Sequence, residues 1–399
     1  MTQPILRPRL PGLTSLRFFA AFLVVLFHLQ SMQITLGPVW FRELSSIGYV
    51  GVSFFFVLSG FILVYTCQGK SVNVMKFWRT RFARIYPAYV FSLLLMAPWF
   101  FYAATKLKFP LFAWATGHLK SASLLVMTLT QAWVPGNALA WNSVCWSLSV
   151  ESFFYLLFPL LLLVFARRSR GRLLFYVAAS WTVGLAISII YLWLKPDGLS
   201  TTNSEVINAF WLNALQFNPM ARLPEFMMGM ACGFLFLRSK KNDKLAVSLI
   251  ATGVAAFILV VRCGNWIPYP VLHTALLAPA FAAIVYGVAL RPRYSKFLEN
   301  KTLVLLGDAS YSLYLLHTLA IGAVFQFSKT GFENPTILKT VAAVTVAVLV
   351  SVAVYRWIEV PGLRMLRPKD KRKPEIVPQS VFVPVQVPIQ AAVQVQVEA

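Results

Sequence analysis

The chain has 399 residues, of which 58% are hydrophobic and 12% are charged, whereas a soluble domain carries about 25% charged residues. Composition therefore excludes an ordinary soluble protein, and repeated apolar stretches of about twenty residues predict an all-α protein that crosses the membrane many times. In a soluble chain the net charge of +23 would favour a nucleic-acid partner, but membrane orientation explains it here, and we expect no nucleic-acid binding.

Hydropathy and helix-breaking residues predict about ten transmembrane helices. The first follows Arg7 and Arg9, as a signal sequence would, but lacks a small-residue cleavage site, so we expect it to be retained as a span. The predicted helices cover residues 13–33, 47–67, 84–104, 146–166, 173–194, 219–237, 245–262, 270–290, 306–327 and 337–358. We expect three parts: a cytoplasmic segment 1–12, a transmembrane domain 13–365 and a mostly disordered cytoplasmic tail 366–399. The four cysteines follow no metal-ligand spacing, so no metal site is expected.

The basic residues predict how these helices are oriented. With the N-terminus in the cytoplasm, 25 of the 36 Lys and Arg residues fall in inside segments and 8 in outside segments. This asymmetry follows the positive-inside rule and predicts a multi-pass protein of the cytoplasmic (inner) membrane with both termini in the cytoplasm. Residues 119–134 are apolar but short and rich in Ser and Thr, and we interpret them as re-entrant or interfacial. A full crossing there would move every later basic loop outside.

The first predicted helix carries two ionisable residues at the ends of the run RFFAAFLVVLFH. Arg17 and His28 are eleven residues apart, which turns an α-helix by about 1100° and advances it by roughly 16 Å. Their side chains therefore point in nearly the same direction, with Arg17 near the cytoplasmic face and His28 in the outer half of the membrane. Ionisable groups inside a membrane are usually kept for a function.

A second basic group, in the segment FWRTRFARIYP, surrounds the start of the third predicted helix. Arginine forks bind phosphate oxygens bidentately, so Arg79, Arg81 and Arg84 are candidates, with Arg17, for holding a donor that carries phosphates. The positive-inside rule by itself also explains the first three arginines, so their ligand role needs other support.

Glu151 lies near the start of the predicted helix 146–166, also in the outer half of the membrane. No basic residue lies within a turn of it, and an unpaired carboxylate at that depth is costly. It therefore requires a partner from another helix or a polar cavity. Ser147 and Ser149, in the same segment, are candidate donors to a developing oxyanion.

Two later helices place further polar groups at a similar depth. Arg222 and Glu225 are three residues apart, close enough to pair on one helix face, and a structural ion pair is the favoured interpretation. Tyr314 and His317 share a face of the helix 306–327, where each is either a candidate oxyanion donor or a hydrogen-bond bridge between helices. We expect these groups, His28 and Glu151 to converge.

Six segments in order resemble acyltransferase family 3, a family of membrane-bound O-acyltransferases that modify sugars. The resemblance covers most of residues 12–365, in the segments GLTSLRFFAAFLVVLFH, GYVGVSFFFVLSGFIL, RTRFARIYP, WSLSVESFFYLLFP, RLPEFMMG and GDASYSLYLLH. It implies His28 as the catalytic histidine, Arg17 as its motif partner and Glu151 as the acidic residue of the central motif.

The resemblance also implies the reaction. An acyl group, most often acetyl, would pass from cytoplasmic acyl-CoA, a co-substrate rather than a tightly bound cofactor, to a sugar hydroxyl of a glycan, exopolysaccharide or glycolipid at the outer face. Membrane lipids and other glycan-synthesis proteins are the expected partners. We expect arginines to hold the CoA phosphates, the pantetheine arm to run along the Arg17–His28 stripe, and neutral His28 to act as the base.

Several alternatives remain open at the level of sequence. Glu151 is expected to orient the His28 ring, as the carboxylate does in hydrolase triads, but His28 acting first as an acyl acceptor is an equal possibility. A transporter or flippase for an anionic or glycolipid substrate would use the same buried charges, although the sequence shows no inverted repeat. A structural scaffold would leave His28 and Glu151 unexplained.

Overall fold

The computed structural model of the chain describes residues 8–34, 37–67, 69, 72–108, 110–198, 209–327 and 336–368. Most of these residues are helical and no strand occurs among them, which confirms the predicted all-α class. The disorder expected for the tail concerns residues that, from 369 onward, lie outside the described part of the chain.

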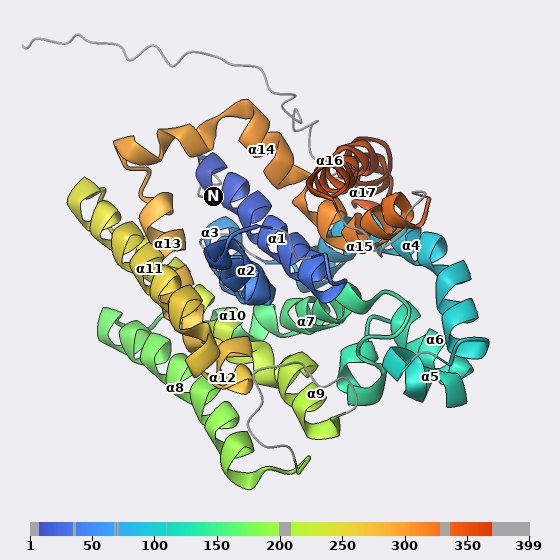
Figure 1. The fold of residues 1–399 in the computed structure, drawn as a ribbon. Helices are drawn as coiled ribbons and strands as arrows, with labels where there is room; N and C mark the ends of the chain where they lie inside the picture. The colour runs from blue at the N-terminus through green and yellow to red at the C-terminus, as the bar shows by residue number, and fades with distance from the viewer. Residues whose placement is uncertain are drawn as a thin grey trace, which may run out of the picture. The chain divides into compact units, whose positions relative to one another are not determined.

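Several connections between the helices contain single 3₁₀ turns. In chain order they are α1 (Pro11–Ser31), α2 (Val39–Ser46), α3 (Gly51–Cys67), α4 (Val74–Thr105), α5 (Ala113–Gly117), α6 (Leu119–Met127), α7 (Trp146–Ala166), α8 (Arg170–Leu194), α9 (Phe210–Phe217), α10 (Pro219–Phe236), α11 (Asp243–Cys263), α12 (Tyr269–His273), α13 (Ala278–Ala289), α14 (Lys301–Asp308), α15 (Ser310–Gln326), α16 (Ile337–Val354) and α17 (Val360–Leu366) (Figure 1).

Within the described residues, seven helices are long and apolar enough to cross a membrane, and two bent pairs raise the number to nine. One pair joins Ala275–Ala289 to Arg293–Glu299 at 92°, and the other joins α14 to α15 at 67°. All ten predicted spans fall on helices, but the count of ten is not confirmed. The predicted span that is not among these nine is α10, in which Arg222 and Glu225 lower the mean hydropathy.

Two segments differ in extent from simple spans. Helix α4 begins at Val74, ten residues before the predicted start, because the side chain of Asn73 caps it by accepting a 2.9 Å hydrogen bond from the amide of Lys76. The basic segment is therefore helical. The ambiguous segment forms the nine-residue α6 followed by 3₁₀ turns, and nine residues advance a helix by only about 14 Å. It is too short to cross, as the re-entrant or interfacial interpretation requires.

Helix α3 lies inside the bundle, whereas α11 lies at its edge. In the apolar stretch of α3, 72% of the residues are buried, against 17% in α11. Glycines allow α3 to approach its neighbours closely: a Cβ at Gly60 would overlap the carbonyl oxygen of Phe226 on α10, and one at Gly229 would overlap that of Val57 on α3. Small residues at such crossings are typical of helices packed in membranes.

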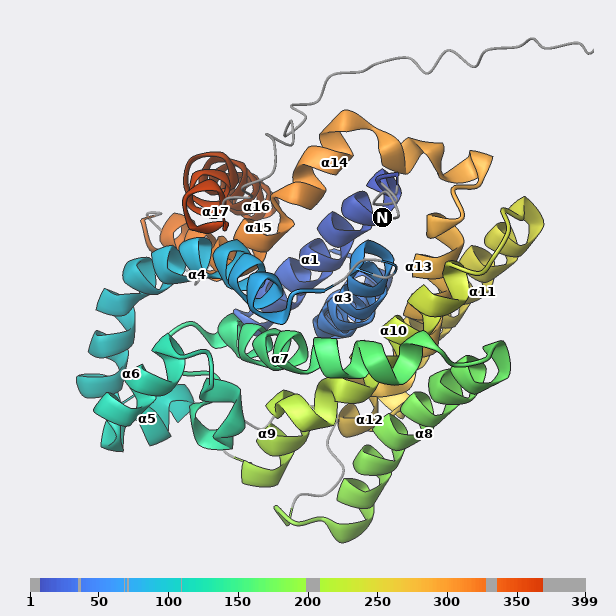
Figure 2. The same cartoon turned by 180° about the vertical axis from the view of Figure 1, so that it is seen from behind.

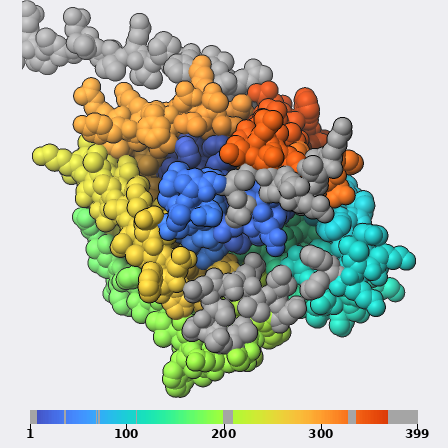
Figure 3. Space-filling model, viewed as in Figure 1, coloured from blue at the N-terminus to red at the C-terminus, as the bar shows by residue number. Residues whose placement is uncertain are grey.

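Helix α1 lies among α3, α14 and α15 near the centre of the bundle, as both opposite views show (Figures 1 and 2). A Cβ at Gly48 or Gly51 would overlap a carbonyl oxygen of α1, and one at Gly307 of α14 would overlap that of Thr14. In the space-filling view, α1 and α2 occupy the middle of one face, between yellow α11 and orange α14–α16 (Figure 3). The close contact with α14 positions α15, and so its histidine, along α1.

Candidate active site

A pair of histidines from α1 and α15 forms the centre of the candidate site. The Nδ1 atom of His28 lies 3.1 Å from the Nε2 atom of His317, with the ring centroids 4.8 Å apart. The same Nδ1 atom lies 2.9 Å from the carbonyl oxygen of Val24. His317 is fully buried, and its Nδ1 atom lies 3.1 Å from the carbonyl oxygen of Leu313 and 2.9 Å from that of Tyr314. The two histidines that the sequence places at similar depth are therefore in direct contact.

A charged cluster surrounds Arg17, three turns before His28 on the same helix. The charges that act on Arg17 are those of Arg84 on α4 and of the carboxylates Glu359, Asp308 and Glu151, and the same three carboxylates act on Arg84. Arg17 and Arg84 as whole residues are half-buried. Neither makes a hydrogen bond or an ion pair within 4 Å to any described residue, so their N–H groups are available to a ligand.

Glu151 belongs to this charged cluster and not to the histidine pair. Its Oε1 atom accepts hydrogen bonds from the hydroxyls of Tyr155, at 2.5 Å, and Ser59, at 3.4 Å. Among the described residues no carboxylate acts electrostatically on His28. The expectation that Glu151 orients the His28 ring is thus not met. The physical reason is that Tyr155, one turn along the same helix, and Ser59 on α3 bond to the carboxylate, which lies in the charged cluster around Arg17.

The three arginines of α4 lie in different surroundings. Arg84 faces Arg17 and the carboxylates. Arg81 lies with its guanidinium carbon 5.4 Å from the ring centre of Phe77 and 5.7 Å from that of Tyr155, within the range of cation–π contacts. Arg79 is exposed. Only Arg84 of the three acts electrostatically on Arg17, so it alone gains support for a ligand role.

Arg222 and Glu225 form a separate, buried ion pair. The Nη2 atom of Arg222 lies 3.0 Å from Glu225 Oε2, and both side chains are at most 2% exposed. The guanidinium also donates to the hydroxyl of Ser53, at 2.9 Å, and to the carbonyl oxygen of His273, and it lies over the ring of Trp146. The contacts with Ser53, His273 and Trp146 join α10 to three other helices, which agrees with the structural ion pair favoured from the sequence.

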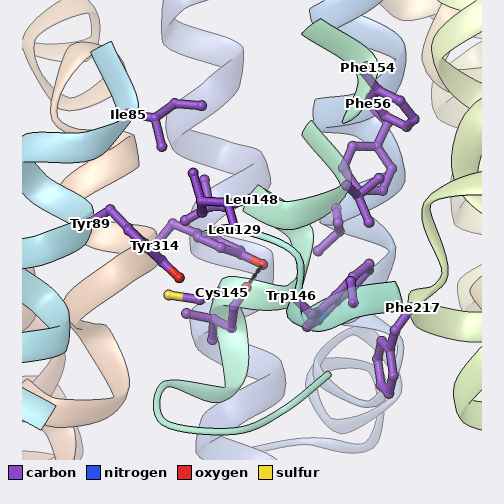
Figure 4. Close-up of a cluster of buried hydrophobic side chains, with 14 of the residues drawn as sticks. Phe56, Ile85, Tyr89, Leu129, Cys145, Trp146, Leu148, Phe154, Phe217 and Tyr314 are labelled. Carbon is purple, nitrogen blue, oxygen red and sulfur yellow. Dashed lines mark hydrogen bonds between the residues drawn. The ribbon is translucent and has the colours of Figure 1, made fainter. Parts of the chain in front are cut away.

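Tyr314 and Ser147 bridge α15 and the start of α7. Their hydroxyl oxygens are 2.7 Å apart, and each also lies within hydrogen-bond distance of the carbonyl oxygen of Val144. Three contacts thus share two hydroxyl protons, so neither proton is free for an oxyanion. Figure 4 shows Tyr314 reaching toward α7 beside Cys145 and Leu148. Ser149, fully buried, accepts a 3.3 Å hydrogen bond from the amide of Ala132. The interhelical role is therefore favoured for these hydroxyls.

Two members of the charged cluster were not among the residues selected from the sequence. Asp308 ends α14, and Glu359 lies in a π turn after α16, where its Oε2 atom accepts a 2.9 Å hydrogen bond from Ser312. The sequence carries a signal for Asp308, since the chain has only 13 Asp and Glu residues and acidic residues in predicted spans such as 306–327 are rare. Glu359 directly follows the predicted span 337–358. What the sequence could not show is that α14 and the end of α16 meet at Arg17.

Comparison with known proteins identifies the chemistry of this framework. A family model described as an acyltransferase domain matches residues 10–356. The chain is 27% identical to acyltransferase MdmB of Streptomyces mycarofaciens, over 90% of this chain and 92% of that protein. It is 28% identical to the exopolysaccharide production protein ExoZ of Rhizobium meliloti, over 80% of this chain and 90% of that protein.

A third relative is longer than this chain. O-acetyltransferase OatA of Staphylococcus aureus is 24% identical over 88% of this chain, but the match covers only 57% of OatA. No solved structure matches the chain. Because the acyltransferase model covers nearly all of the helical part, the chain belongs to acyltransferase family 3 and is a membrane O-acyltransferase.

Proposed function

We propose that this protein transfers an acetyl group from cytoplasmic acetyl-CoA to a hydroxyl group of a sugar in a glycan, exopolysaccharide or glycolipid at the outer face of the cytoplasmic membrane. The observation that carries the proposal is that α1 holds two unlike functional groups at different depths. Arg17 offers N–H groups that bond to no described residue, within the charged cluster, and His28, three turns along, presents an imidazole paired with His317. The names of OatA and ExoZ favour acetyl as the group and a polysaccharide as the acceptor.

Arg17 and Arg84 would hold the phosphates of the donor. Both are half-buried and make no hydrogen bond to the described residues, and guanidinium groups recognise phosphate bidentately. The nearby Glu359, Asp308 and Glu151 balance their charge when the donor is absent. Acyl-CoA is a co-substrate in this proposal, and no tightly bound cofactor takes part.

His28 would act as the base. The sugar O–H gives its proton to the imidazole as the oxygen bonds to the thioester carbonyl carbon. The C–S bond then breaks, and the departing CoA sulfur takes the proton from the imidazolium, so the histidine is regenerated. If His28 accepts the acyl group first, its Nε2 atom bonds to the thioester carbonyl carbon as the C–S bond breaks and the CoA thiolate leaves. The sugar oxygen then bonds to the same carbon as the N–C bond breaks, and the hydroxyl proton passes to the CoA thiolate. The second route predicts that label from acetyl-CoA becomes bound to the protein and is released when the acceptor is added. The first route predicts no such protein-bound label.

The test uses membranes containing the full chain, supplied with acetyl-CoA labelled in the acetyl group. His28→Ala should abolish transfer of label to glycan or lipid, whereas the same change at the exposed His118 should have no effect. Arg17→Ala should raise KM for acetyl-CoA by about 10- to 100-fold, because a hydrogen bond to a charged group contributes about 1.5–3 kcal/mol. Equal labelling in the wild type and in both site variants would overturn the proposal and favour a transporter.

A further inference from the structure

His317 is a buried titratable group that the proposed reaction does not use. It is fully buried, comes from a helix nearly 300 residues away from His28 in sequence, and contacts the proposed base directly. We infer that His317 is a positioning residue: it holds His28 in the tautomer with hydrogen on Nδ1, so that Nε2 of His28 is the nitrogen that reacts. This inference rests on the proposed function for its catalytic consequence, but not for the tautomer itself.

The tautomer of His317 follows from its two carbonyl partners. A carbonyl oxygen only accepts hydrogen bonds. The Nδ1 atom of His317 lies 3.1 Å from the carbonyl oxygen of Leu313 and 2.9 Å from that of Tyr314, so Nδ1 must carry the hydrogen. In the neutral ring the Nε2 atom is then an acceptor, and this is the atom that faces His28.

The tautomer of His28 follows in the same way. Its Nδ1 atom lies 2.9 Å from the carbonyl oxygen of Val24 and 3.1 Å from the Nε2 acceptor of His317. Two acceptors face one nitrogen, so Nδ1 of His28 carries the hydrogen and shares it between them. The Nε2 atom of His28 is left with its lone pair, and no described residue forms a hydrogen bond with it.

Only His317 of the two acceptors comes from another helix. Val24 lies one turn from His28 on α1 and moves with it, whereas His317 fixes the ring relative to α15. Without His317 the ring of His28 is free to turn away from Val24, so its tautomer is no longer fixed. No described carboxylate acts electrostatically on either histidine, and the charge that acts on His317 is that of His28. A neutral imidazole therefore takes the place that a carboxylate occupies in hydrolase triads.

The pair is not a proton relay. The proton on Nδ1 of His317 faces two backbone carbonyls, which have no basic site to receive it. When His28 takes a proton from the attacking hydroxyl, its Nδ1–H stays between Val24 and His317, and both acceptors stabilise the positive charge. The proton can leave only from Nε2, toward the departing sulfur.

The direct test is nitrogen NMR of the full chain in lipid bilayers, with ¹⁵N-labelled histidine. The chain has four histidines, so the His28 signals are assigned by their loss in His28→Gln. In the wild type we expect a protonated Nδ1 and an unprotonated Nε2. His317→Leu should shift His28 toward a mixture of tautomers, whereas His317→Gln, which keeps an acceptor near the former Nε2 position, should preserve the wild-type pattern. His118→Gln is the matched control at an exposed position.

Kinetics with acetyl-CoA supply the second readout. His317→Leu should lower kcat for CoA release by up to about 10⁴-fold, the loss known for a catalytic histidine in the wrong tautomer, with KM for acetyl-CoA unchanged. His317→Gln should restore most of the rate. Hydrogen on Nε2 of His28 in the wild type would overturn the inference, as would unchanged tautomer and kcat in His317→Leu. If the tautomers are as expected but even the wild type cleaves no acetyl-CoA, the proposed function fails and the tautomer assignment stands.

Discussion

Polar and charged residues inside this bundle interact with groups from distant parts of the chain. His28 on α1 is matched by His317 on α15, Arg17 lies among carboxylates of three later segments, and Arg222 is joined to Ser53 as well as to its helix neighbour Glu225. In a low-dielectric environment each such group depends on its partners, because water does not replace them. The two kinds of cluster differ in one respect: Arg222 has an ion pair and hydrogen bonds to Ser53 and His273, whereas Arg17 makes neither kind of bond to a described residue.

This difference predicts the effect of breaking the buried ion pair. Glu225→Leu leaves the guanidinium of Arg222 buried without its carboxylate, so we expect the free energy of unfolding to fall by about 3–5 kcal/mol. Thermal unfolding of purified protein in detergent measures this loss. The double variant Arg222→Met, Glu225→Leu should be more stable than Glu225→Leu alone, since it removes both charges. A single variant as stable as the wild type would contradict the structural role.

The protonation of His28 predicts how the rate depends on pH. Only the neutral imidazole has a lone pair on Nε2, so acyl transfer should be lost as pH falls below the pKa of His28 and should level off above it. The initial rate of CoA release between about pH 5 and pH 9 measures this profile. A rate that does not change on the acid side would exclude a histidine base.

At the scale of helices, packing depends on a few glycines where backbones touch. Gly60 and Gly229 let α3 and α10 meet, and Gly48 and Gly51 let α3 meet α1. These crossings hold the helix that carries His28 against the rest of the bundle. They also explain why glycines occur in apolar runs, where they otherwise disfavour a helix by about 1 kcal/mol relative to alanine.

A matched pair of substitutions tests this packing. Gly229→Ala places a methyl group against the carbonyl oxygen of Val57, whereas nothing lies within 4 Å of the position that a Cβ at Gly322 would take. We expect Gly229→Ala to lower Tm and reduce the yield of folded protein, while Gly322→Ala leaves Tm unchanged or raises it slightly. Equal behaviour of the two variants in detergent would show that the close crossing is not needed.

The sequence predicts the helices better than it predicts the side-chain contacts between them. The apolar segments and the helical spacing of Arg17 and His28 could be predicted, because both depend on local periodicity. The pairing of His28 with His317 could not, because it depends on how α15 is rotated against α1. Glu151 shows the same limit: its depth was predictable, but its partners Tyr155 and Ser59 are set by the packing of α7 against α3. The sequence predicts a start of α4 that is later than Val74, because the first turns of this helix are basic and not apolar.

At the scale of the whole molecule, the distribution of charge predicts which side of the membrane each loop faces. Lys195 follows α8 and Lys240 follows α10, both exposed, and the positive-inside rule places Lys195 outside and Lys240 in the cytoplasm. In a variant with Cys67 and Cys263 replaced by serine, Lys195→Cys should react with a membrane-impermeant maleimide on intact cells. Lys240→Cys should react only after permeabilisation. The reverse pattern of labelling would show that the protein has the opposite orientation in the membrane.

The central claim is that the acyl group enters from the cytoplasmic face, at Arg17, and reacts at His28 deeper in the membrane. Acetyl-CoA does not cross a bilayer, so vesicles of defined sidedness test this claim most directly. With acetyl-labelled acetyl-CoA outside, inside-out vesicles should incorporate label into glycan or lipid, whereas right-side-out vesicles and inside-out vesicles with His28→Ala should not. Equal incorporation in both orientations, or incorporation that survives His28→Ala, would contradict the account.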